Sequence, residues 1–177
     1  MLRPHLLLLL FLTFLPRLLA DTAPSLAGTW KIDLARSTEL SPWKDYELTL
    51  QVGKGSVTVA RKLAWGRRVY EDKTTFPTTG KQTKLPFNFW PDNRHLGANV
   101  GADKTQRVAA HWLDDGRLLR VTSDFVLTTQ QGDRAINVLS DYKVSGNGTE
   151  LTLTELRSTR NRPVVYVFKR VTPTESK

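Results

Sequence analysis

Apolar and polar residues alternate strictly along most of this chain, and that period of two limits the folds it can adopt. Residues 45–52 read Asp-Tyr-Glu-Leu-Thr-Leu-Gln-Val, and the same alternation runs through 119–127 and 136–144. Because successive side chains of a β-strand point to opposite faces, each run predicts a strand with one buried and one solvated face. We therefore expect an all-β, antiparallel protein.

Turn-forming residues separate these runs at the spacing that an antiparallel meander needs. Short segments rich in glycine, aspartate and asparagine, such as 53–55, 114–116 and 145–148, tolerate positive φ. A turn of helix is expected near 35–44. The alternation and the turns predict about ten strands, near residues 27–34, 45–52, 56–65, 68–76, 81–88, 105–113, 117–129, 134–144, 149–158 and 163–171.

An open sheet of that many strands would leave exposed edges and a large apolar face. Closing the sheet into a barrel removes both problems. Because consecutive strands are joined by hairpin signals, we expect a single up-and-down antiparallel barrel of eight to ten strands, formed by residues 21–177.

The first 20 residues have the pattern of a secretory signal peptide. Arg3 gives a charged start, residues 6–15 are almost wholly apolar, and Ala20 offers a small residue before a cut at Asp21. The apolar run is about half the ~20 residues that a membrane helix needs. We therefore expect cleavage, no transmembrane anchor afterwards, and a periplasmic or secreted protein.

The chain has no cysteine, which excludes disulfides, catalytic thiols and thiolate metal sites together. Exported animal domains of this size often use disulfides, so their absence favours a bacterial periplasm.

The formal net charge is +9, and losing Arg3 and Arg17 with residues 1–20 lowers it by two, to +7. The basic residues are dispersed as pairs such as Arg61-Lys62 and Arg67-Arg68, without a basic helix stripe or a nucleic-acid motif. We interpret them as solvated side chains on the outer faces of strands and expect no nucleic-acid partner. Attraction to an anionic cell-envelope surface is the functional alternative.

A short motif at the start of the first predicted strand resembles a known family. Gly28-Thr29-Trp30 is a Gly-x-Trp element like the opening motif of lipocalins and fatty-acid-binding proteins. The stretch 28–37 is also similar to the start of small exported bacterial lipocalin-like proteins of uncharacterised function. Ser140-Asp141-Tyr142 resembles the Thr-Asp-Tyr element of lipocalins. The resemblance implies a lipocalin-like (calycin-like) barrel.

The same resemblance gives Trp30 a structural role. In those families the Trp of the motif closes one barrel end, beneath a cation from a late strand. The glycine of the motif corresponds here to Gly28. Arg157, Lys169 and Arg170 are all candidates for that cation, and Arg170 is our first choice.

The segment 85–97 interrupts the alternation and predicts a long loop at one rim of the barrel. It holds three aromatic residues, two prolines and a compact polar group at 92–95. Such a loop can act as a lid or contact surface, or its aromatic residues can seal the barrel end.

No segment carries a recognisable catalytic or cofactor motif. Asp92 with His95 would need a third ligand to hold a metal, and His111 is the only other imidazole after residue 20. The chain has no Gly-x-Ser-x-Gly elbow and no glycine-rich phosphate loop. We therefore expect no metal and no cofactor, and we favour a non-enzymatic function.

Continuing the alternation through 149–158 places Glu155 and Arg157 on the inward face, and Tyr142 faces inward from the preceding strand. Buried charges need partners, so either the two pair or the interior is wet enough for a polar ligand. A bulge or a rim position would instead leave them outside. If the barrel carries a ligand, these three residues should line the cavity, and Arg157 could receive an anionic head group. The residues expected over its entrance are Trp90, Arg94 and His95.

These sequence features are compatible with three functions. The first is a binding protein for a small amphipathic or anionic ligand or an envelope component, and a cavity of several hundred Å³ would support it. The second is a structural or protein-interaction module with a side-chain-filled barrel and an exposed apolar patch. The third is a hydrolase that uses facing carboxylates at the barrel mouth.

The signal-peptide assignment predicts that residues 1–20 are absent from the exported protein. N-terminal sequencing of exported material is expected to begin at or near Asp21. Intact Met1 on membrane-bound protein would instead make the apolar run an anchor.

Overall fold

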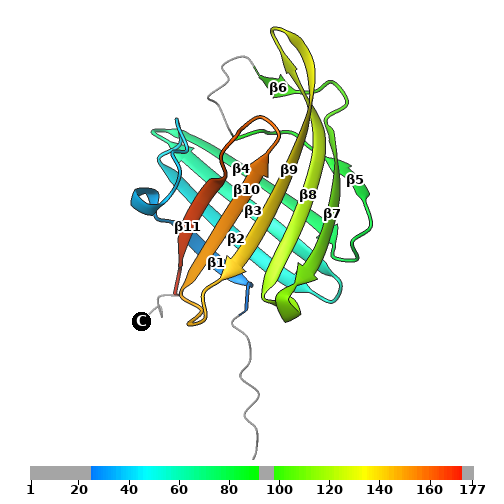
Figure 1. Cartoon of the computed structure of the whole chain (residues 1–177). Coiled ribbons are helices and arrows are strands. Elements are labelled where there is room, and N and C mark those ends of the chain that lie inside the picture. The colour runs from blue at the N-terminus through cyan, green and yellow to red at the C-terminus, as the bar shows by residue number, and fades with distance from the viewer. Residues whose placement is uncertain (1–24, 92–97, 173–177) are drawn as a thin grey trace, which may run out of the picture.

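A computed structural model of the chain describes residues 25–91 and 98–172, which form one antiparallel sheet wrapped into a nearly closed barrel (Figure 1). Its short helical segments are the 3-10 turns η1 (Leu34–Arg36) and η2 (Asp114–Gly116). Residues 1–20, the expected signal peptide, lie outside the described part. The strands are β1 (Gly28–Ile32), β2 (Asp45–Gly53), β3 (Ser56–Trp65), β4 (Arg68–Pro77), β5 (Thr83–Pro86), β6 (Asn99–Val100), β7 (Thr105–Leu113), β8 (Leu118–Thr129), β9 (Gly132–Val144), β10 (Glu150–Arg157) and β11 (Val164–Arg170).

The strands follow the up-and-down order that the sequence predicts. The sheet runs β4-β3-β2-β1-β11-β10-β9-β8-β7-β5, and β6 pairs with β8 outside that path. The first strand therefore lies beside the last one. Each predicted strand is present, and its ends differ from the prediction by two residues at most. The sequence did not predict β6, because a strand of two residues is too short to show an alternation. The all-β, up-and-down prediction is confirmed.

One place in the barrel lacks a hydrogen-bonded ladder. The path ends at β4 on one side and at β5 on the other, so two sheet edges face each other there. Beside this gap, an isolated bridge between Thr79 of the β4–β5 connection and His111 of β7 extends the β5–β7 pairing. We call the gap between β4 and β5 the seam.

The connections alternate between two ends of the barrel because neighbouring strands are antiparallel. We call the end with the 54–55 and 145–149 turns the closed end. The opposite end, the rim end, has the β3–β4, β8–β9 and β10–β11 turns and the segment that follows β5 (Figure 1).

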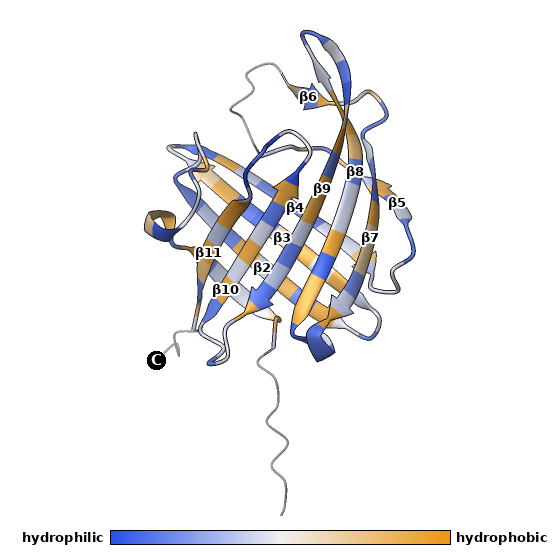
Figure 2. Cartoon of the chain, in the orientation of Figure 1, coloured by the Kyte–Doolittle hydropathy of each residue, from blue (hydrophilic) through white to orange (hydrophobic). Residues whose placement is uncertain are grey.

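Apolar and polar residues alternate in bands along the strands (Figure 2), and the apolar residues at the inward positions are buried. The larger core cluster includes the fully buried Trp30, Leu48, Leu151 and Phe168 and reaches the rim end at Leu63 and Val164. A smaller cluster near the rim end joins residues of β8 and β9 to the segment after β5. Its buried members are Phe87, Phe125, Leu127, Ile136 and Val138.

Trp30 and Arg170 seal the closed end. Trp30 is 0% exposed, and its indole N–H donates a 3.2 Å hydrogen bond to the carbonyl of Leu26. The guanidinium carbon of Arg170 lies 4.0 Å from the Trp30 ring centroid. Arg170 also donates hydrogen bonds to the carbonyls of Ala27 at 2.8 Å and Gly148 at 2.6 Å. One side chain of β11 thus holds both the start of the first strand and the turn before β10.

Gly28 is required by this arrangement. Its φ of +139° disfavours a side chain, and a Cβ atom there would lie 2.5 Å from the guanidinium of Arg170. The other two candidate cations have different partners. Lys169 pairs with Asp33 at 3.0 Å, and Arg157 pairs with Glu155 inside the barrel.

Replacing Trp30 with alanine should lower the free energy of unfolding by about 3–5 kcal/mol, because it leaves a large cavity and removes the cation–π contact. Trp65→Ala is the matched control: Trp65 is 42% exposed, so its loss should cost about 1 kcal/mol or less. Urea unfolding of the two variants measures the difference. Equal stabilities would show that the closed end does not depend on Trp30.

Candidate functional site

A small cavity of about 90 Å³ lies in the rim half of the barrel. Its walls come from β3, β4 and β7 to β10, and Phe87 and Trp90, from the segment after β5, also line it. Its apolar lining is completed by valines and by Phe76 and Phe125. The polar residues that line it are Arg61, Thr74, Gln106, Ser123, Ser140, Tyr142 and Glu155.

Arg61 enters the interior because the period of two continues along β3. Val57, Val59 and Leu63 are buried inward residues, and Arg61 has the same parity. Its guanidinium makes a bidentate pair with Asp72 on β4, with Nε–Oδ1 at 2.8 Å and a second contact from Nη2 to Oδ2. Burial disfavours the charged form of Arg61, but the hydrogen bond and the charge of Asp72 outweigh burial and raise its pKa.

A second ion pair, between Arg157 and Glu155, lies on β10. The Arg157 side chain is 1% exposed, and its Nε donates to Glu155 Oε2 at 2.8 Å. Its guanidinium carbon lies 4.8 Å from the Trp90 ring centroid, and Nη2 is 3.4 Å from the Tyr166 hydroxyl. Arg157 therefore lies behind Glu155, beside the cavity rather than on its surface.

The structure brings together part of the predicted ligand site. Tyr142, Glu155 and Trp90 line the cavity, and Arg157 contacts two of the three. Arg94 and His95, expected over the entrance, lie outside the described residues, as does Asp92.

Arg61 is the interior residue that the sequence did not lead us to expect. The adjacent basic pair Arg61-Lys62 suggested a solvated outer face, and for Arg61 that prediction is wrong. The alternation of Val57, Val59 and Leu63 was the signal that could have corrected it.

Tyr142 couples the two ion pairs electrostatically. Burial raises the pKa of its phenol, the charge of Glu155 raises it further, and Arg61 opposes both. Tyr46 behaves similarly: burial raises its pKa well above the usual value while Arg61 lowers it. Two arginines and two carboxylates thus form one neutral polar layer across the barrel. The side chains that offer uncharged donors and acceptors to the cavity are Thr74, Gln106, Ser123 and Ser140.

A second space, the seam groove, adjoins the cavity. It measures about 300 Å³ and lies between β4 and residues 85–88. Thr74, Phe87 and Gln106 line both spaces, so the groove meets the cavity at these side chains. Leu85 and Tyr70 add apolar surface to the groove, and Glu71, Asp72 and Lys73 add charged side chains.

The described residues contain no group of three or more His, Cys, Asp or Glu side chains that could hold a metal ion. His111 lies on the outward face of β7, opposite Arg120. Asp72 and Glu155 each accept hydrogen bonds from an arginine. In residues 25–91 and 98–172, no helix is long and apolar enough to cross a bilayer.

The fold and the cavity define the class of this protein: a lipocalin-like antiparallel barrel with a polar layer near one end. No protein-family model matches the chain, and no curated protein is significantly similar to it in sequence. Among solved structures, secretory abundant heat soluble protein 4 from Ramazzottius varieornatus is similar in fold. The TM-score is 0.51 at 11% identity, over 82% of this chain and 94% of that chain.

Two further structures align over most of the barrel. Human cRBP IV has a TM-score of 0.46 at 16% identity, over 83% of this chain and 98% of that chain. The fatty-acid-binding protein from Manduca sexta has a TM-score of 0.43 at 12% identity, over 82% of this chain and 99% of that chain. At these identities a likeness concerns the fold and not the ligand.

The raised pKa values of Tyr46 and Tyr142 predict a loss of stability in alkali. A phenol whose pKa is higher in the folded protein stabilises the fold below the unfolded pKa of about 10 and loses that contribution as the pH rises above it. Urea unfolding between about pH 9 and pH 11 should therefore show a smaller decline for Tyr142→Phe than for the unchanged protein. Tyr70→Phe, which alters a more exposed phenol with a smaller upward shift of its pKa, is the control. Identical declines in all three proteins would contradict the burial of Tyr142.

Proposed function

We propose that the chain is an exported lipocalin-like binding protein for a small amphipathic ligand. The polar head of the ligand occupies the cavity beneath Trp90, and its apolar part lies in the seam groove. The observation that carries the proposal is the polar layer itself: fully or partly buried hydroxyl, amide and charged groups line a cavity inside an otherwise apolar barrel. Packing alone does not call for such groups, since apolar residues of similar volume would fill the space at no cost of desolvation.

The size of the two spaces limits the ligand. Pockets for drug-sized molecules measure about 300–1,000 Å³. The cavity of about 90 Å³ holds only a head group, whereas the cavity and the seam groove of about 300 Å³ together reach the lower end of that range. The ligand is therefore small and extended rather than bulky.

The charges in the polar layer favour an uncharged head group. Each arginine already has a carboxylate partner, so an anion would have to displace Asp72 from Arg61 and lie beside Glu155. Burying an additional unpaired charge is costly. A hydroxyl or amide head can instead use the uncharged side chains of Ser123 and Ser140. An anionic ligand is the weaker alternative.

A protein-interaction module is the second candidate function. The buried apolar cluster around Trp30 and Leu48 favours it, because dense packing there leaves little room for a ligand. The pairing of each interior carboxylate with an arginine offers no support for the hydrolase alternative. For the binding protein, the signal pattern of residues 1–20 and the absence of cysteine support a periplasmic or secreted location, and the charge of +7 that remains without residues 1–20 is compatible with an anionic envelope.

Displacement of the neutral dye N-phenyl-1-naphthylamine tests the binding proposal. Decanol should displace the dye at a lower concentration than decanoate, which has a similar chain but a charged head. Ser123→Leu fills the cavity and should weaken dye binding at least about tenfold, the effect of losing ~1.4 kcal/mol. Thr122→Leu adds the same side chain at the adjacent outward position of β8 and should leave binding unchanged.

Two outcomes would count against this site. Equal binding by the two leucine variants would place the dye elsewhere, and decanoate displacing the dye better than decanol would favour an anionic head. Glu155→Gln gives a further check, because removing one carboxylate should raise the affinity for decanoate while leaving that for decanol nearly unchanged.

A further inference from the structure

One turn at the rim end displays apolar side chains that the core does not use. β3 and β4 are joined through residues Trp65–Val69, which we call the rim turn. Trp65 is 42% exposed and Val69 is 56% exposed, whereas the inward residues near the middle of β3 are buried. A single exposed apolar residue is ordinary on a protein surface. The rim turn differs because of the charges between its two apolar residues.

Arg67 and Arg68 occupy the centre of the rim turn. The guanidinium carbon of Arg68 lies 5.4 Å from the Trp65 ring centroid. Within residues 25–91 and 98–172, neither arginine has a carboxylate partner. By contrast Lys62, farther along β3, pairs with Glu71 at 3.0 Å. The rim turn therefore keeps two positive charges that the described part of the protein does not neutralise.

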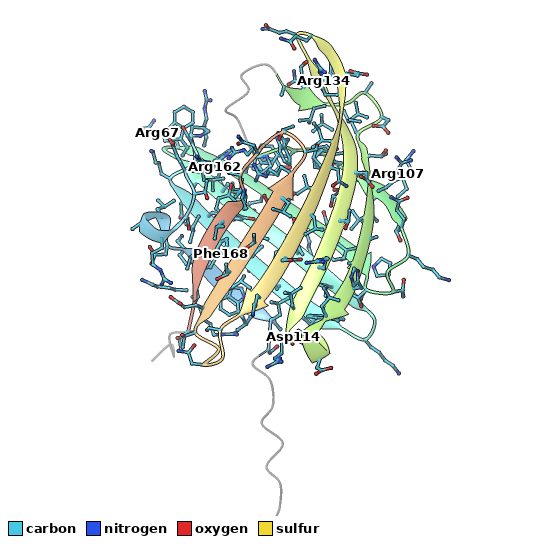
Figure 3. The ribbon with its side chains drawn as sticks, in the orientation of Figure 1. Arg67, Arg107, Asp114, Arg134, Arg162 and Phe168 are labelled. Atoms are coloured by element: carbon cyan, nitrogen blue, oxygen red, sulfur yellow. The ribbon has the colours of Figure 1, made fainter. Side chains whose placement is uncertain are left out.

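Other basic side chains lie at the same end of the barrel. Arg134 begins the β9 side of the β8–β9 turn, and Arg162 lies in the β10–β11 turn. Figure 3 shows both, together with Arg67, at the rim end, whereas Asp114 lies at the opposite end. Arg67, Arg68, Arg134 and Arg162 thus place four basic side chains at the rim end, where Asp133 lies next to Arg134.

We propose that the rim turn docks this protein on an anionic lipid bilayer. Tryptophan is enriched at the boundary between lipid and water, and arginines near an anionic bilayer are attracted to its surface potential. Trp65 and Val69 supply the apolar contact that shallow insertion requires. A soluble polyanion would use the arginines but gain nothing from these two side chains, so the combination favours lipid. This proposal goes beyond ligand binding and does not depend on it.

Co-sedimentation with lipid vesicles tests the proposal, using phosphatidylcholine vesicles with and without about 30% phosphatidylglycerol. The protein should bind the anionic vesicles, and added salt should weaken that binding. The double variant Arg67→Gln/Arg68→Gln should bind at least about tenfold more weakly, since each arginine contributes about a fivefold effect. Trp65→Ser should also weaken binding, by about threefold or more. Circular dichroism checks that both variants keep the fold.

The control variant, Lys54→Gln/Lys81→Gln, removes the same net charge from turns away from the rim end, where both lysines are exposed. It should change vesicle binding less than twofold. Each variant and the unchanged chain are prepared alike, either both with residues 1–20 or both without them. Any contribution of residues 6–15 to vesicle binding is then the same in the two proteins. Equal losses in the two double variants, or no binding to anionic vesicles, would overturn the proposal. The proposal would also be overturned if Arg67→Gln/Arg68→Gln weakened binding to dextran sulfate but left binding to anionic vesicles unchanged. Dye binding by the cavity is measured without vesicles, so its result stands apart from this one.

Discussion

The contact between Trp30 and Arg170 is the constraint on which the rest of the barrel depends. The two residues are directly opposite each other in the register of β1 and β11, so the contact joins the first strand to the last. β1 is only five residues long, and it must pair with β2 on one side and β11 on the other. A strand so short has few ladder hydrogen bonds, and the buried indole and the guanidinium above it supply much of what holds it in place. The packed closed half follows from this anchor.

The two halves of the barrel meet different physical demands. The closed end, around the fully buried Trp30 and Leu151, is apolar, as the densely packed interiors of most domains are. The rim half contains two ion pairs that are largely shielded from water, an arrangement that seldom adds stability over an apolar core of the same volume. A polar layer of this kind persists when it serves a role that apolar packing cannot serve, such as contact with the polar part of another molecule. The proposed ligand site rests on this contrast.

Residue alternation carries most of the fold information in this sequence. It predicts the strands, their approximate bounds and the inward positions of Tyr142, Glu155 and Arg157, because one period governs them all. Arg61 has the inward parity of β3, yet its basic neighbour Lys62 suggested solvent, and here parity was the better guide. The seam could not be predicted, because whether two strand edges meet depends on the curvature of the whole sheet and not on either strand alone. The resemblance at Gly28 and Trp30 supplied what periodicity lacks, namely which residues lie at the closed end.

The seam has a mechanical consequence. A barrel whose strands are all joined by hydrogen bonds can widen only if some of those bonds break. This barrel is a split ring: Thr79 and Gly80 of the β4–β5 connection bond to β7 near the closed end, and the described strands have no ladder across the gap toward the rim. Such a ring can flex about its bonded end: widening it near the rim would rearrange the stacking of Tyr70 on Phe89 and the hydrogen bond from Trp43 to the Pro91 carbonyl, but would break no ladder bond. How easily the barrel widens at the seam, more than the volume of its cavity in this structure, would then decide which molecules can enter.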